Sequence, residues 1–227
     1  MRHHLLALIA ALLAPGAAFA ADPAHPTVVE LFQSQGCSSC PPANANLLKL
    51  IDRPDVLALS WQVTYWDELG WKDTFAHPAF TARQWEYARA WSRKQVATPQ
   101  VVVNGRADAV GARPGEIEGL IRKADRGVGG PQIALTDGRA RVSGAGPGGA
   151  VWLVRYDPRL QPVPIKRGEN GGKTLPHRNI VREVVRLGDW SGGARDYALP
   201  PAAGSGLKTA VLVQAGPGGA ILAAARG

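Results

Sequence analysis

The chain has 227 residues, a formal net charge of +8 and only two cysteines. Two cysteines in a chain of this length exclude a scaffold built from disulfides, so the core must be hydrophobic. Lysines and arginines are spread along the chain and do not alternate with aromatic residues in runs, which argues against a nucleic-acid-binding surface. No nucleic-acid partner is therefore expected, and no oligomeric state is indicated.

The first twenty residues have the pattern of an export signal peptide. Arg2 gives a positive start, residues 5–13 are apolar, and Ala18-Phe19-Ala20 is typical of a cleavage site. The apolar stretch is too short for a bilayer-spanning helix, which needs about 20 residues. The alternative is a retained buried or anchoring helix. We expect cleavage after Ala20 and a periplasmic or secreted protein that is not embedded in a membrane.

Residues 27–126 alternate between strand and helix signals. Apolar and β-branched runs predict strands at Thr27–Gln33, Val56–Val63, Gln100–Val103 and Ala107–Val110. Apolar residues at helical spacing, or a proline at a helix start, predict helices over Pro41–Asp52, over Pro78–Lys94 and from Pro114 onward. Asn104-Gly105 is a strong hairpin turn between the last two strands. The predicted order is βαβα followed by ββα.

From Gly127 the pattern changes to short strands and glycine-rich turns. Asp137-Gly138 lies between two strand-like runs. Later apolar runs lie at Val151–Tyr156, Ile180–Leu187, Ala210–Gln214 and Ala220–Ala224. We therefore expect an α/β region at residues 21–128 and an all-β C-terminal domain, such as a small sandwich, at residues 129–227.

Cys37-Ser38-Ser39-Cys40 stands between the first predicted strand and the first predicted helix. Two thiols separated by two residues at a helix start are typical of thiol–disulfide exchange. The free amides and dipole of a helix N-terminus lower the pKa of a cysteine thiol, so we expect Cys37 to be the exposed attacking thiol. Cys40 is then the resolving thiol. Pro41 and Pro42 lack amide protons, which limits this activation.

Two other roles for the cysteines fit the sequence less well. As a structural staple, a disulfide that closes a four-residue loop stabilises the fold by only about 2 kcal/mol. As a zinc site, the two thiolates supply half of a tetrahedral shell, and neither His77 nor His177 falls at ligand spacing. No metal site and no cofactor are assigned, and copper(I) held by two thiolates stays open as an alternative.

The element order, with Cys-x-x-Cys after the first strand, resembles the thioredoxin fold. In that fold a cis proline opens a strand and faces the disulfide, and here Thr98-Pro99 directly precedes a predicted strand. We expect a cis bond that exposes the Thr98 backbone to an extended substrate chain. The resemblance also implies a buried acid that serves Cys40 as a base. Glu30 is the candidate, one residue out of register, and an outward-facing or salt-bridged Glu30 is the alternative.

Tryptophans and a polar segment supply further candidates. Spacing predicts that Trp61, Trp85 and Trp91 belong to the core. Trp66 and Trp71 flank a loop-like segment, and we expect them to form a substrate-binding lip over the cysteines. A dense polar segment comprises Arg167, Glu169, Asn170, His177 and Arg178. It is either a solvated connection or a loop that reaches back over the site and restricts access to it.

Four segments together are similar to one known family. They are VELFQSQGCSSCPPA at 29–43, YWDELGWKD at 65–73, TPQVVVNG at 98–105 and RGEN at 167–170. They resemble the exported bacterial family named only as domain of unknown function twelve twenty-three. The resemblance implies a thioredoxin-like domain with an appended β region and no known substrate. The family pattern often carries a histidine and an aspartate where this chain has Gln62 and Thr64.

These features predict an exported thiol–disulfide oxidoreductase. Its partners would be protein thiols or disulfides in the extracytoplasmic space. Reductase, oxidase and isomerase activity are all consistent with the motif, because the redox potential sets the direction. The rival interpretation is a non-catalytic thioredoxin-like binder of copper(I) or of a protein partner.

Overall fold

The computed structural model describes residues 21–227, so the expected signal peptide lies outside the described residues. The described chain has a mixed α/β architecture. Its helices are α1 (Cys40–Leu50), α2 (Pro78–Ala90) and α3 (Pro114–Lys123). Its strands before α3 are β1 (Thr27–Gln33), β2 (Val56–Gln62), β3 (Gln100–Val103) and β4 (Ala107–Ala109). None of the three helices is long and apolar enough to cross a membrane.

Only strands follow α3 in the described chain. They are β5 (Gln132–Thr136), β6 (Arg139–Ser143), β7 (Gly149–Asp157), β8 (Gln161–Pro164), β9 (Thr174–His177), β10 (Ile180–Trp190), β11 (Arg195–Ala198), β12 (Lys208–Gln214) and β13 (Ile221–Arg226). The predicted order of βαβα and then ββα is confirmed for the first half. The prediction that the second half is built from strands is confirmed as well.

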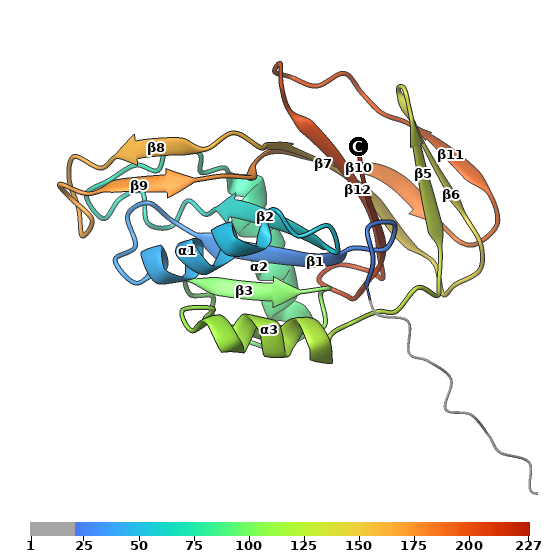
Figure 1. Ribbon diagram of the computed structural model, residues 1–227, viewed down its shortest axis with the longest axis horizontal. Coiled ribbons are helices and arrows are strands. Elements are labelled where there is room, and N and C mark those ends of the chain that lie inside the picture. Colours follow the sequence, from blue (N-terminus) through green and yellow to red (C-terminus); the bar gives the residue numbers. More distant parts are fainter. Residues whose placement is uncertain (1–20) are drawn as a thin grey trace, which may run out of the picture.

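One large sheet runs through both halves of the chain (Figure 1). Its strand order is β13-β12-β7-β10-β2-β1-β3-β4. Strand β1 is parallel to β2 and antiparallel to β3. The two halves join where β10 pairs in parallel with β2, with Ile180 opposite Ser60. The Asn179 side-chain amide strengthens this junction by donating to the Ala58 carbonyl at 2.8 Å. The β-rich region therefore continues the sheet of the first half, and a domain boundary near residue 129 stays a prediction.

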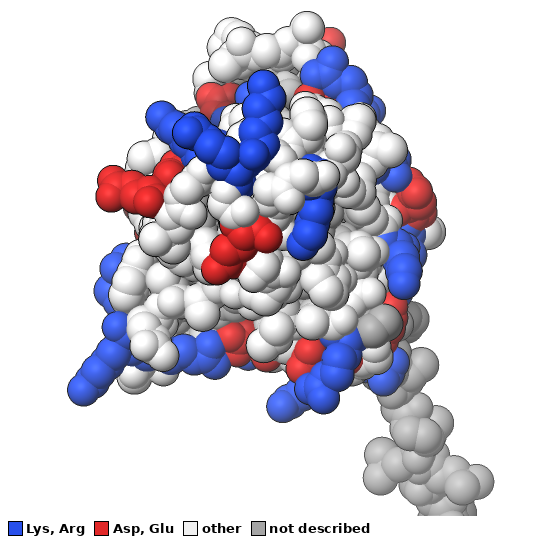
Figure 2. Space-filling view, turned by 90° about the vertical axis from the view of Figure 1, so that its left-hand side faces the viewer, with Lys and Arg blue, Asp and Glu red and all other residues white. Residues whose placement is uncertain are grey.

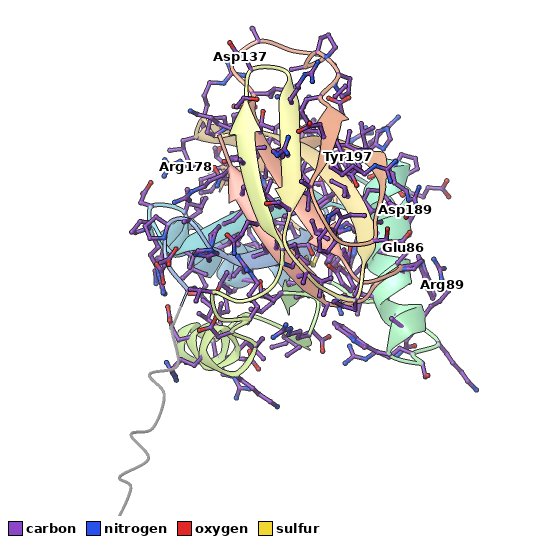
Figure 3. The ribbon with its side chains drawn as sticks, turned by 90° about the vertical axis from the view of Figure 1, so that its right-hand side faces the viewer. Glu86, Arg89, Asp137, Arg178, Asp189 and Tyr197 are labelled. Atoms are coloured by element: carbon purple, nitrogen blue, oxygen red, sulfur yellow. A yellow bond between two sulfur atoms is a disulfide. The ribbon has the colours of Figure 1, made fainter. Side chains whose placement is uncertain are left out.

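Helices and a small second sheet cover the two faces of this sheet. Alternate residues of β1 point to opposite sides, so Val29 and Leu31 pack with α1 and α3 while Val28 and Phe32 pack on the side of α2. The three-stranded sheet β11-β6-β5 packs against alternate residues of β7, β12 and β13. Figure 3 shows Asp137 at the tip of hairpin β5–β6, with Tyr197 near Asp189, whose carbonyl accepts the Tyr197 hydroxyl at 2.7 Å.

The predicted tryptophan core is only partly correct. Trp61 is fully buried and Trp91 packs against the same cluster, but Trp85 is half-buried. The buried side of α2 instead consists of Phe80, Arg83, Gln84, Tyr87 and Ala88. Two of these residues are polar and have hydrogen-bond partners outside the helix. Gln84 donates to the Ala97 carbonyl and the Gln100 side chain, and Arg83 is described below.

Candidate functional site

The two cysteines form a disulfide at the start of α1. Their Cα atoms are 5.4 Å apart, and the Cys40 amide donates to the Cys37 carbonyl at 3.2 Å. Helix α1 begins at Cys40 with Pro41 and Pro42 in its first turn, as the sequence predicts. Because neither proline has an amide proton, donors near the sulfurs come from the residues before them.

Thr98 and Pro99 lie directly against this disulfide, although they are distant in sequence. The Thr98–Pro99 bond is cis, as expected. The Cys37 Sγ atom lies 3.8 Å from the Thr98 carbonyl oxygen. An open groove of about 540 Å³ leads away from Pro99 between residues 93–97 and residues 108–110. The structure therefore brings together four of the predicted site residues, Cys37, Cys40, Thr98 and Pro99.

Trp66 and Trp71 also lie at the site. The Trp66 indole donates to the Thr98 hydroxyl at 2.7 Å, and the Trp71 indole donates to the Gln35 side-chain oxygen at 2.9 Å. A Cβ atom added to Gly36 would lie 3.6 Å from both the Trp66 Cβ atom and the Trp71 carbonyl. Both tryptophans thus pack against the segment that leads into Cys37, and their role in binding a substrate stays a prediction.

A loop from the β-rich region closes over the cysteine segment. The Asn170 side-chain amide donates to the carbonyls of Gln35 (2.9 Å) and Cys37 (2.8 Å). The Glu169 carboxylate accepts the Ser38 amide at 3.0 Å. Of the two alternatives for this polar segment, the structure has the one that reaches back. We call residues 165–173 the covering loop.

The covering loop meets the tryptophan loop through two glycines. Gly70 and Gly168 both have positive φ angles, +101° and +75°, which favour glycine. A Cβ atom on Gly70 would lie only 3.2 Å from the Gly168 Cα atom, so any other residue there would push the loops apart. This close approach lets the two loops enclose the cysteine segment together.

The expectation that Cys37 is exposed is wrong for the disulfide form. Cys37 is 0% exposed and Cys40 is 2% exposed, whereas Ser38 and Ser39 are exposed. The cause is the covering loop together with Thr98, which the sequence places far from the cysteines. An attacking partner therefore reaches Cys37 only after some of these contacts open.

Glu30 does not lie with the cysteines. Its carboxylate is fully buried on the side of the sheet that faces α2, where Arg83 Nε binds it at 2.6 Å. Cys40 starts the helix on the other side. The salt-bridged alternative for Glu30 is therefore the correct one, and its carboxylate is not placed to take a proton from Cys40.

Two buried titratable groups, Asp73 and His177, lie near the site in places that the sequence does not predict. Burial raises the pKa of Asp73 to about 6, and its carboxylate accepts the amides of Gln35 (2.7 Å) and Phe75 (2.8 Å). Burial lowers the pKa of His177 to about 4, and this side chain lines a small cavity together with Cys40. A signal for His177 was present, because Leu175 and His177 share one side of a short alternating strand.

The geometry of the described residues offers little to a metal ion. Residues 21–227 contain no group of three His, Cys, Asp or Glu side chains arranged to hold one. His77 instead caps α2, since its Nδ1 atom accepts the Ala79 amide at 3.1 Å. The copper(I) alternative therefore rests on the two sulfur atoms alone.

Figure 2 shows one end of the molecule, where basic and acidic side chains are interspersed rather than gathered by sign.

Removing the charge of Glu169 should make Cys37 reactive at a lower pH. Hydrogen bonds from the Ser38 side chain and backbone lower the pKa of Glu169, so it is a carboxylate at neutral pH, next to the segment that carries Cys37. A nearby negative charge disfavours a thiolate. In the reduced protein, Glu169→Gln should lower the pH midpoint of Cys37 alkylation by up to about one pH unit.

The control for this prediction is Glu86→Gln, which removes the same charge from α2, on the face shown in Figure 3. Its alkylation midpoint should match that of the unmodified protein. An unchanged midpoint in Glu169→Gln would mean that the Glu169 carboxylate has no electrostatic effect on the thiol.

Known proteins resemble this chain over most of its length. The pattern of the family described as "Protein of unknown function (DUF1223)" matches residues 28–214. The crystal structure of protein AGR_C_4864 from Agrobacterium tumefaciens is similar at 31% sequence identity and a TM-score of 0.72, over 91% of this chain and 94% of that chain. HBP35 of Porphyromonas gingivalis shares the fold at 12% identity and a TM-score of 0.59, over 92% of this chain and 75% of that one. No curated protein sequence matches the chain. The chain belongs to the DUF1223 family of proteins of unknown function.

Proposed function

We propose that this protein is a thioredoxin-like dithiol–disulfide exchanger that acts on proteins outside the cytoplasm. The observation that carries the proposal is the contact between Cys37 and the Thr98 carbonyl, 61 residues apart in sequence. A cysteine pair at a helix start supplies the chemistry. Strand β3 begins at Gln100, directly after Pro99, and the Thr98 backbone before it lies at the sulfurs, which supplies a place for an extended substrate chain.

The exchange has two steps. The Cys37 thiolate attacks a sulfur of the substrate disulfide, which forms a mixed disulfide and releases one substrate thiolate. The Cys40 thiolate then attacks Cys37 Sγ, which closes the Cys37–Cys40 disulfide and releases the second substrate thiolate. The reverse sequence oxidises a substrate dithiol. The extracytoplasmic location is proposed from the N-terminal export pattern.

The covering loop favours a restricted set of partners over general exchange. Cys37 is 0% exposed in the disulfide form, and Asn170 and Glu169 hold the segment around it. A partner must displace or bind this loop to reach the sulfur. We therefore propose that access, as well as thiol chemistry, selects the substrate.

Trapping with Cys40→Ser tests the proposal. Without the resolving thiol, the mixed disulfide persists, so this variant should accumulate covalent adducts with proteins of a bacterial periplasmic extract. Non-reducing electrophoresis should reveal the adducts, and dithiothreitol should release them. The Cys37→Ser/Cys40→Ser double variant is the matched control and should form none.

Two results would contradict exchange. One is the absence of adducts with Cys40→Ser together with a Cys37 that alkylates only near the ordinary thiol pKa of about 8.5. The other is tight binding of one copper(I) per reduced protein without reaction with any disulfide, which would support the non-catalytic rival.

A further inference from the structure

A small cavity lies beside Cys40 and shares no lining residue with the open groove at Pro99. Its volume is about 90 Å³, which is large enough for water. It is lined by Gln33, Ser34, Cys40, Pro41, Asn44, Ala45, Leu175, Pro176 and His177. In Figure 1 the hairpin β8–β9, which ends in His177, lies beside α1 at the same end of the molecule. The β-rich region therefore completes the wall of a cavity at the resolving cysteine.

His177 faces this cavity with no hydrogen-bond partner among the described residues. Its side chain is 1% exposed, and both ring nitrogens lack a partner. A buried imidazole without partners is costly, because it has one donor and one acceptor to satisfy. The Phe75 ring packs edge-on against the imidazole, with the two ring centroids 5.9 Å apart. Water in the cavity would supply the missing partners.

The other polar groups in the cavity wall are already engaged. The Gln33 amide donates to Ser60 and to Asn44, and the Asn44 amide donates to the Pro176 carbonyl at 2.6 Å. No Asp, Glu, Lys or Arg lines the cavity. Two charged residues contact Phe75, whose ring packs against the His177 ring. Asp73 accepts the Phe75 amide, and Arg182 lies 5.1 Å above the Phe75 ring.

Cys40 and His177 are therefore the titratable pair in this wall, and Cys40 needs a proton acceptor. We infer that His177 takes the proton of Cys40, through water in the cavity, when Cys40 attacks the mixed disulfide. This inference rests on the proposed exchange function and assigns to His177 the role that the sequence suggested for Glu30. Burial lowers the pKa of His177 to about 4, so the imidazole is neutral and a ring nitrogen is free to accept. The same burial disfavours the imidazolium, which the negative charge forming on Cys40 offsets during the step.

In this step the proton of Cys40 moves to His177 and the electron pair leaves with the substrate sulfur. The Cys40 S–H bond breaks and its proton passes through water to a His177 ring nitrogen. The Cys40 thiolate attacks Cys37 Sγ, the Cys37–Cys40 bond forms, and the bond from Cys37 to the substrate sulfur breaks. The electron pair leaves with the substrate thiolate. The imidazolium then releases its proton to solvent or to that thiolate, and His177 is neutral again.

The test separates the two steps with 5,5′-dithiobis(2-nitrobenzoic acid) and the reduced protein. Attack by Cys37 releases the first coloured thiolate, and attack by Cys40 releases the second. In His177→Gln we expect the first phase to stay within about two-fold of the unmodified protein. The second phase should slow by about 100-fold, the lower end of general-base effects. His77→Gln, which changes a histidine outside the cavity, should leave both phases unchanged.

The outcomes distinguish the two proposals. If the unmodified protein shows no first phase, the proposed exchange function fails. If the first phase is normal and His177→Gln leaves the second unchanged, exchange stands and the role of His177 is overturned. Should His177→Gln not fold, NMR of the unmodified protein decides. In the reduced protein the His177 ring signals should shift at the pH where Cys40 loses its proton, because the thiolate then forms beside the ring, and the absence of such a shift would overturn the inference.

Discussion

Replacing Arg83 with methionine should lower the free energy of unfolding by about 3–5 kcal/mol, the usual cost of breaking a buried ion pair. Arg83 is 4% exposed and Glu30 is 0% exposed. Nε and Nη2 of the guanidinium bind the two carboxylate oxygens at 2.6 and 3.1 Å. Methionine fills similar space without a charge, so the Glu30 carboxylate would be left buried and unpaired.

The pair belongs to a wider buried network, which raises the cost. The guanidinium also donates to the Gln214 side-chain oxygen (3.0 Å) and to the Tyr87 hydroxyl (3.0 Å), while that hydroxyl donates to Glu30. Burial would lower the pKa of Arg83, but the Glu30 carboxylate holds it above its ordinary value. The network joins β1, α2 and β12, so its loss weakens the connection between the two halves of the chain.

Urea denaturation measures the effect, with a lower midpoint and an unchanged slope expected. Arg89→Met on the exposed side of the same helix should change stability by no more than about 0.5 kcal/mol (Figure 3). Glu30→Gln/Arg83→Met should be more stable than the sum of the single losses predicts, because it leaves no unpaired charge. Strict additivity would show that the two side chains do not stabilise each other.

The same network explains where sequence reasoning failed for α2. Hydrophobic spacing placed Trp85 in the core, yet the buried positions include Arg83 and Gln84. Arg83 is buried because Glu30 lies opposite, and Gln84 because it donates to Ala97 and Gln100. A pattern within one helix cannot reveal partners on other elements. The strands and helices of the first half were predictable because their signals are local, as at Thr27–Gln33.

The residues of the candidate site likewise fall into two groups: those with a local sequence signal and those whose position depends on distant contacts. The cysteines, Thr98 and Pro99 were identified because each carries a local signature. The burial of Cys37 was not predictable, since it depends on Asn170, 133 residues further along the chain. The sequence pattern places His177 in a polar segment and away from metal-ligand spacing. Its position beside Cys40 follows from the packing of β9 on α1, and the sequence of neither segment predicts this contact.

Replacing Asn170 with alanine should open the site to small reagents. The Asn170 side chain is fully buried and satisfies two backbone carbonyls, so its removal leaves two buried acceptors, each worth about 1–3 kcal/mol. Lys173 Nζ also donates to Asn170 Oδ1, at 2.9 Å, within the covering loop. Local opening that becomes easier by one or two kcal/mol increases the population of the open form about 5- to 30-fold.

The measurement is the rate at which tris(2-carboxyethyl)phosphine reduces the Cys37–Cys40 disulfide under native conditions, and this rate should rise by the same factor. The matched control is Asn46→Ala. Asn46 lies on α1, and its side-chain amide also donates to two carbonyls, those of Gly111 (3.0 Å) and Ala112 (2.9 Å). Among the described hydrogen bonds it has none to the covering loop. It should destabilise the fold comparably without accelerating reduction.

Equal acceleration in both variants would show that the reagent enters by global unfolding, and no acceleration in Asn170→Ala would show that the covering loop does not limit access. Faster reduction in Asn170→Ala alone would make the β-rich region the element that controls when Cys37 is reached.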